Sequence, residues 1–156
     1  MEMSKLKIRE AKNSDSEKIK SVVFDVLKEY ELDPDPGATD KDLDGIENYY
    51  CLNGGYFGVI EEDGDIVATV GIYKLNENIC ELRKMYALPS QRGKGLGRKL
   101  MEFSLAKAKD LGFERVVLET ASPLVEAIAL YKKYGFIEYS PDHLSSRCDQ
   151  AFELYL

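Results

Sequence analysis

The segment QRGKGLGRKL, residues 91–100, constrains the fold more than any other stretch of the chain. It follows an extended, mostly apolar run and contains three glycines and four cations. Glycines let successive backbone N–H groups turn toward one point, and a helix that begins directly afterwards adds unpaired N–H groups and the positive end of its dipole. A basic glycine corner between a strand and a helix is therefore typical of a site for phosphate or pyrophosphate.

The glycine spacing excludes two common nucleotide-binding corners. A P-loop needs a second glycine five residues after the first, and a Rossmann corner needs the third glycine of G-x-G-x-x-G. In both patterns Arg98 stands where that glycine is required, if Gly93 is taken as the first. The pattern that does fit is Arg-x-x-Gly-x-Gly, formed by Arg92, Gly95 and Gly97. For the corner alone, a surface loop before a helix is the competing interpretation.

Composition limits the class of partner. The formal net charge of −7 argues against nucleic acid or a membrane surface, since both are polyanionic, and suits a cationic substrate better. Cys51, Cys80 and Cys148 form no CxxC metal pair, and no apolar run reaches bilayer length. A length of 156 residues fits one ordinary domain, so we expect a single domain over residues 1–156. We also expect reduced thiols, a cytoplasmic location, no metal, and a monomer or homodimer.

Hydrophobic periodicity and turn residues predict an α+β domain. The order is strand, two helices, a three-strand meander, helix, strand, helix and two strands. A proline at the first turn of a helix costs no hydrogen bond, so Ser122-Pro123 is expected to begin the last helix. The predicted strands are 6–11, 56–62, 65–75, 79–88, 115–120, 136–140 and 151–156, and the predicted helices are 14–30, a short one after Thr39, one from the corner to about 111, and one from 122 to 134.

Three stretches, ELRKMYALPSQRGKGLGRKL, VVLET and AIALYKKYGF, together resemble the GNAT superfamily of acetyl-CoA-dependent N-acetyltransferases. The resemblance is strongest from Cys80 to Tyr139, and the predicted element order extends it over nearly the whole chain. It implies a mixed, mostly antiparallel central sheet with helices on both faces. It also implies a parallel strand pair, 79–87 and 115–120, that splays apart to admit the cofactor.

The resemblance also implies the residues that bind acetyl-CoA. The turn would hold the pyrophosphate, and the backbone of the strand before it would meet the pantetheine. Many members carry Asn three residues before the position of Ala127, where this chain has Leu124, so one polar contact is missing from the pattern. The implied residues are Arg92, Gly93, Lys94, Gly95, Leu96 and Gly97 in the turn, and Met85, Tyr86 and Ala87 in the strand.

Acetyl transfer from a thioester to a primary amine needs a base for the ammonium and an acid for the leaving thiolate. The resemblance implies Glu81 as the base and Tyr131 as the acid. Glu119, at the end of VVLET, is the second candidate base. The competing interpretations are an ion pair of Glu81 with Arg83, a helix-start partner for Glu119, and a core aromatic for Tyr131.

Several alternatives stay open. The acceptor can be a small molecule or a protein amino group, and a catalytically inactive CoA-binding domain is the second function class. Cys80 could form an acetyl-cysteine, although no His stands nearby to activate it. DKDLDG, 40–45, begins like an EF-hand loop, but Cys51 occupies the place of its bidentate Glu, so we expect an acid-rich helix start. His143, Arg147 and Cys148 belong to an acceptor-site rim or to the surface.

Overall fold

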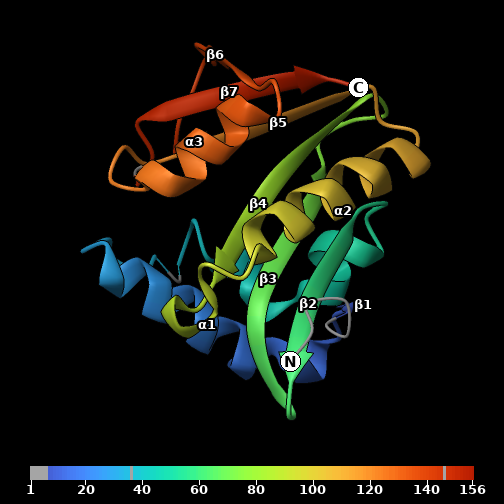
Figure 1. Cartoon of the computed structure of the whole chain (residues 1–156). Helices are drawn as coiled ribbons and strands as arrows, with labels where there is room; N and C mark the ends of the chain where they lie inside the picture. The colour runs from blue at the N-terminus through green and yellow to red at the C-terminus, as the bar shows by residue number, and fades with distance from the viewer. Residues whose placement is uncertain (1–6, 36, 146) are drawn as a thin grey trace.

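In a computed structural model, residues 7–35, 37–145 and 147–156 are described, and a seven-stranded sheet runs through them (Figure 1). The strand order is β1-β2-β3-β4-β5-β7-β6. Leu6, at the start of the first predicted strand, lies outside the described residues. The main elements are β1 Ile8–Glu10, α1 Ser16–Glu29, β2 Tyr56–Glu62, β3 Asp65–Lys74, β4 Ile79–Ala87, α2 Leu96–Asp110, β5 Arg115–Thr120, α3 Val125–Lys133, β6 Ile137–Tyr139 and β7 Gln150–Tyr155.

One pair of strands in this sheet is parallel, and it splays. All other neighbours in the described sheet are antiparallel, whereas β4 and β5 run in the same direction. Their pairing begins at Ile79 with Arg115 and ends at Glu81 with Val117. Beyond those residues the backbone of β4 has lost its partner on that side, and the two strands separate. The predicted α+β fold with a splayed parallel pair is confirmed.

Helices cover both faces of the sheet, as predicted (Figure 1). On one face α2 and α3 contribute Leu100, Met101 and Tyr131 to a core that includes Val70 and Phe152. On the other face α1 and two short helices bury an equally apolar cluster of Ile19, Val23, Leu27, Leu43, Ile46 and Tyr50. Among the described residues no helix is both long and apolar enough to span a bilayer.

An irregularity in β4 changes the direction of its side chains. Thr69 of β3 pairs with Tyr86, but Gly71, two residues later, pairs with Arg83, so β4 carries one extra residue. Lys84 in this bulge has a φ of 54°, in the left-handed region that non-glycine residues rarely adopt. Alternation is interrupted there, so the consecutive residues Arg83 and Lys84 both reach the face that α1 covers. Sequence periodicity does not predict this, because no glycine marks the position.

Two helix predictions were wrong. The helix after β5 begins at Val125 rather than at Ser122-Pro123, which form a turn. Asp149 holds that turn, since its carboxylate accepts bonds from the Ser122 N–H at 2.9 Å and the Ser122 hydroxyl at 2.8 Å. The single helix expected after Thr39 is two short ones, η3 Lys41–Asp44 and η4 Glu47–Cys51, of which η3 is a 3₁₀-helix and η4 a π-helix.

Candidate active site

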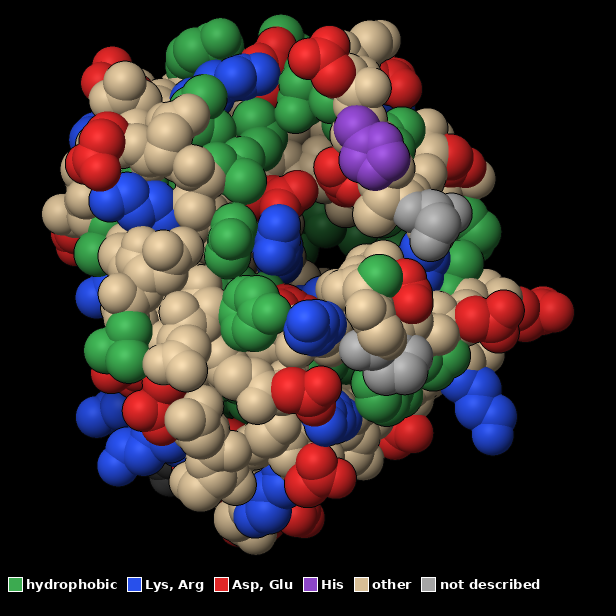
Figure 2. Space-filling model, turned by 180° about the vertical axis from the view of Figure 1, so that it is seen from behind, with side chains coloured by type: hydrophobic (Ala, Val, Ile, Leu, Met, Phe, Trp, Pro, Cys, Tyr) green, Lys and Arg blue, Asp and Glu red, His purple; other side chains and the backbone are tan. Residues whose placement is uncertain are grey.

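A cavity of about 830 Å³ extends from the glycine corner to Ala38 and Thr39, which precede the short helices. It passes through the gap between β4 and β5 and reaches His143, Arg147 and Cys148 at its far end. From behind, the molecule shows a hollow that side chains of both charges border (Figure 2). The three residues that the sequence suggested for an acceptor-site rim therefore do line this cavity.

Backbone conformation shapes the corner end. Gly93 and Gly95 have φ values of 80° and 78°, which L residues with a side chain rarely adopt. Gly95 is the N-cap of α2, so the unpaired N–H groups of that helix begin here. A methyl group on Gly97 would meet Leu130 Cδ2 at 3.4 Å. Together with Leu96, these glycines line the cavity, which leaves a cradle of backbone N–H groups suited to an anion.

The two cations predicted for the corner differ in position. Arg92 lines the cavity, but its guanidinium pairs with Glu29, donates to the Ala87 carbonyl at 3.2 Å and lies over the Tyr30 ring. Lys94 is not among the lining residues. A bound anion would therefore compete with Glu29 for this guanidinium.

The strand segment predicted for pantetheine borders the gap. Met85, Tyr86 and Ala87 all line the cavity. On one side the last two pair with β3, through Thr69 and Ala68, whereas pairing with β5 has already ended at Glu81. Strand backbone that faces a cavity without a neighbouring strand can bind the amides of an extended ligand.

Glu81 is nearly enclosed, with 8% of its surface exposed. The Arg83 Nε donates a 2.5 Å hydrogen bond to its Oε1, as the competing interpretation expected, although both residues lie on the same strand. Burial raises the pKa of Glu81, while Arg83 acts in the opposite direction. A carboxylate with a raised pKa is a stronger base than an exposed one.

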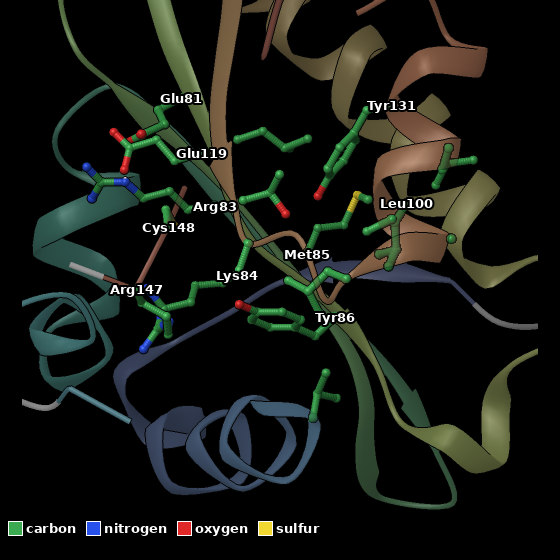
Figure 3. A pocket seen from close by; sticks show the side chains of 18 of the residues that line it. Glu81, Arg83, Lys84, Met85, Tyr86, Leu100, Glu119, Tyr131, Arg147 and Cys148 are labelled. Carbon is green, nitrogen blue, oxygen red and sulfur yellow. Dashed lines mark hydrogen bonds and ion pairs between the residues drawn. The ribbon is translucent and has the colours of Figure 1, made fainter. Parts of the chain in front are cut away.

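Glu119 lies close to Glu81 (Figure 3), and its negative charge contributes to the raised pKa of Glu81. Its Oε1 accepts a 2.9 Å hydrogen bond from the Ser145 N–H. The helix-start role considered for Glu119 is instead filled by Asp149. Glu81 is the last residue of β4 that pairs with β5, and Glu119 lies two residues after its partner Val117. Both carboxylates therefore lie at the point where the two strands begin to separate.

Tyr131 belongs both to the core and to the cavity. Its ring packs near Phe136 and Phe152 and only 7% of the residue is exposed. Its hydroxyl points into the cavity (Figure 3) and has no hydrogen-bond partner among the described residues. Burial raises the pKa of Tyr131, so the phenol keeps its proton. Tyr134, three residues later, instead donates to Glu102 at 2.6 Å.

A buried network of charges closes the far end. Lys84 Nζ lies 3.4 Å from Asp40 Oδ1 and 3.2 Å from Asp42 Oδ1. Arg147 donates to both Asp40 oxygens, at 2.8 and 2.9 Å, and the Tyr50 hydroxyl donates to Asp42. Although burial opposes it, these cations lower the pKa of Asp40 to about 2. Sequence analysis missed this network, because its members come from distant segments and the bulge in β4 aims Lys84 at the acids.

The structure also bears on the two remaining alternatives, the calcium loop and the acetyl-cysteine. In DKDLDG, Asp40 and Asp42 pair with Lys84 or Arg147, and Asp44 pairs with Lys20. No cluster of three His, Cys, Asp or Glu suited to a metal occurs in the described part of the chain. Cys80 is 1% exposed, and burial raises its pKa to about 12. Such a thiol carries little thiolate, which disfavours an acetyl-cysteine.

The sequence matches the model of the Acetyltransferase (GNAT) family over residues 23–136. The chain belongs to this family. It is 42% identical over 133 residues to the uncharacterized N-acetyltransferase YjgM of Escherichia coli K12, with 81% of this chain and 80% of YjgM covered. This GNAT protein thus has a relative of similar length that is itself described as an N-acetyltransferase.

Solved GNAT structures have the same fold. A GNAT acetyltransferase from Staphylococcus aureus Mu50 superposes with a TM-score of 0.89 at 23% identity, over 96% of this chain and 98% of that one. The structure of yncA from Salmonella typhimurium with its cofactor acetyl-CoA gives a TM-score of 0.74 at 23% identity, over 96% and 93%. At this identity the likeness concerns the fold alone.

Proposed function

We propose that this GNAT protein transfers the acetyl group of acetyl-CoA to a primary amine, by direct attack of the amine in a ternary complex. One observation carries the proposal: a single cavity joins an anion-binding corner, an open strand edge, two carboxylates and a tyrosine hydroxyl. Structural relatives such as yncA hold acetyl-CoA, and the residues of this cavity fit that group. The acceptor is a small molecule or a protein amino group.

The cofactor would be held mainly by backbone. The N–H groups of the Gly93–Gly97 turn and of the first turn of α2 would bind the pyrophosphate. Arg92 would exchange Glu29 for a phosphate, and Lys94 would contribute charge from outside the cavity. The free edge of β4 at residues 85–87 would hold the pantetheine amides, which directs the thioester toward Glu81 and Tyr131.

Glu81 would take the proton that the amine loses as its nitrogen bonds to the thioester carbonyl carbon. Its raised pKa suits this task, and Glu119 is the second candidate. As the carbon–sulfur bond breaks, Tyr131 would give its proton to the sulfur. The phenol is protonated at neutral pH, since the ordinary pKa of a phenol lies well above 7 and burial raises the pKa of Tyr131 further. The products are an N-acetylated amine and free CoA.

The ion pair between Glu81 and Arg83 favours the second function class, a CoA-binding domain without chemistry, because paired strand residues can be purely structural. Release of free thiol from acetyl-CoA with a panel of amines separates the two classes. We expect amine-dependent thiol release that Glu81→Gln strongly reduces at neutral pH. Tight acetyl-CoA binding without thiol release for any amine would support the binding domain instead.

A further inference from the structure

Arg83 presents a fixed guanidinium at the acceptor end of the cavity. Its Nε binds Glu81, and its Cζ lies 4.0 Å from the centre of the Tyr73 ring, which sets the plane of the group. The side chain nevertheless remains 31% exposed and lines the cavity. Glu81 is the only carboxylate paired with Arg83 among the described residues, and it uses Nε alone. The Tyr50 hydroxyl also lies near the guanidinium, but no carboxylate of the described residues pairs with its terminal nitrogens. A ligand carboxylate can therefore bind there, since guanidinium groups bind carboxylates in pairs of hydrogen bonds.

The neighbouring cations are committed elsewhere. Lys84 pairs with Asp40 and Asp42, and Arg147 donates hydrogen bonds to both carboxylate oxygens of Asp40. Close to Arg83 lie Glu81 and Glu119, whose carboxylates Figure 3 shows beside its side chain. An acceptor ammonium is favoured by the two carboxylates, and an acceptor carboxylate by the guanidinium. The lining of this end therefore suits a molecule that carries both charges.

The proton transfer itself creates a need for a second anion. When Glu81 accepts the proton of the amine, it becomes neutral, and Arg83 loses the one carboxylate that pairs with it in the described part of the chain. A cation left without a partner in a largely buried site is costly. A carboxylate of the acceptor on the free nitrogens of Arg83 would remain in place during that step. A neutral or purely cationic amine offers no such compensation.

We propose that the acceptor is a small amino acid, with its amine at Glu81 and its carboxylate on Arg83. This inference rests on the proposed acetyl transfer at Glu81. The separation of the two groups follows from β4: Glu81 and Arg83 stand two residues apart on one face and touch each other. The complementary charges of the acceptor must be equally close, so one or two carbons separate amine and carboxylate, as in α- and β-amino acids.

Matched pairs of acceptors test the inference. The rate constant kcat/KM is measured for an amino acid and for its carboxamide, each corrected for the fraction of free amine. We expect the parent protein to favour the carboxylate by about tenfold or more, the scale of a charge-assisted hydrogen bond. Arg83→Gln should bring this ratio close to one. The ratio is informative because any effect of Arg83 on the base is common to both acceptors.

Two further variants serve as controls. Lys74→Gln removes a cation from the adjacent strand, where it pairs with Glu77 outside the cavity, and should keep the parent ratio. Arg83→Lys keeps the charge without the fork and should give an intermediate ratio, which decides the matter if Arg83→Gln does not fold. A parent ratio near one, or a ratio that Arg83→Gln or Arg83→Lys leaves unchanged, would overturn the inference.

Binding separates this inference from the proposed function. Calorimetry on the protein saturated with CoA compares the amino acid with its carboxamide. Tighter binding of the amino acid, lost in Arg83→Gln, supports the carboxylate site even if no amine is acetylated, in which case only the proposed transfer fails. Equal binding, or none, defeats the carboxylate site even if other amines are acetylated.

Discussion

At the glycine corner the cavity is lined by backbone from one continuous segment, whereas its far end is lined by ionised side chains from three. Gly93, Gly95 and the start of α2 are neighbours in sequence. Glu81, Glu119 and Arg147 come from β4, β5 and the loop before β7, and they line the cavity together only because the fold brings these segments together. The corner thus suits any phosphate-like anion, whereas the charged side chains at the far end can select a particular acceptor. Variants at the two ends should accordingly affect binding of the cofactor and turnover in different ways.

The largest expected effect is at the far end. Glu81→Gln removes the proposed base but keeps its shape, so turnover at neutral pH should fall by about a thousandfold, within the range of general base catalysis. Because burial raises the pKa of Glu81, the parent rate should rise as pH passes through a value above the ordinary carboxyl range. The variant should lack that limb and recover partly at high pH, where the amine deprotonates unaided.

Steady-state thiol release across a pH series checks this, with acetyl-CoA affinity measured alongside. Glu119→Gln is the matched comparison, since it removes a nearby carboxylate that bonds to Ser145. If Glu81→Gln keeps the parent rate and profile while Glu119→Gln loses them, the base is Glu119.

Tyr131→Phe should reduce turnover by about a hundredfold, the usual scale for loss of a positioned acid. The ring and its contacts with Phe136 and Phe152 remain, so folding and acetyl-CoA affinity should hardly change. Single-turnover kinetics and calorimetry give the two quantities separately. Tyr134→Phe is the control, because its hydroxyl bonds to Glu102 rather than pointing into the cavity. An unchanged rate in Tyr131→Phe would make this residue a core aromatic only.

Gly95→Asp acts at the opposite end and should chiefly weaken binding. A side chain at a φ of 78° is strained, and a carboxylate at the start of α2 repels a phosphate. We expect the dissociation constant of acetyl-CoA to rise about thirtyfold, a loss of roughly 2 kcal/mol. Turnover at saturating cofactor should change far less than in Glu81→Gln. Gly64→Asp controls for strain, because Gly64 also has a left-handed φ, of 86°, in a remote hairpin.

The same contrast explains what the sequence could predict. The meander and the helix that begins after the glycine corner follow from glycine spacing and hydrophobic period, which are local, and these predictions were confirmed. Glu81 and Tyr131, in contrast, could be predicted as site residues only because a family resemblance supplied their positions. Their proposed roles await the experiments above.

What could not be predicted depends on contacts between distant residues. The bulge at Lys84 has no glycine to mark it, and only the buried acids of η3 account for where its side chain goes. The start of α3 is delayed by Asp149, a partner 27 residues from Ser122. The DKDLDG segment resembled a calcium loop because Lys84 and Arg147, the cations that pair with its acids Asp40 and Asp42, lie far away in the sequence. In each case tertiary contact overrides the local signal.

The smallest expected effect concerns Glu29, which holds Arg92 at the mouth of the corner. Both side chains are 34% exposed, so the pair is worth only about 0.2–1 kcal/mol. Glu29→Gln should release Arg92 for a phosphate and tighten acetyl-CoA binding by about two- to fivefold, with kcat unchanged. The gain should shrink with added salt, because exposed charges are screened. Glu17→Gln, on the same helix but paired with Lys20, should leave the affinity as it is. Weaker binding in Glu29→Gln would mean that Glu29 positions Arg92 for the cofactor rather than competing with it.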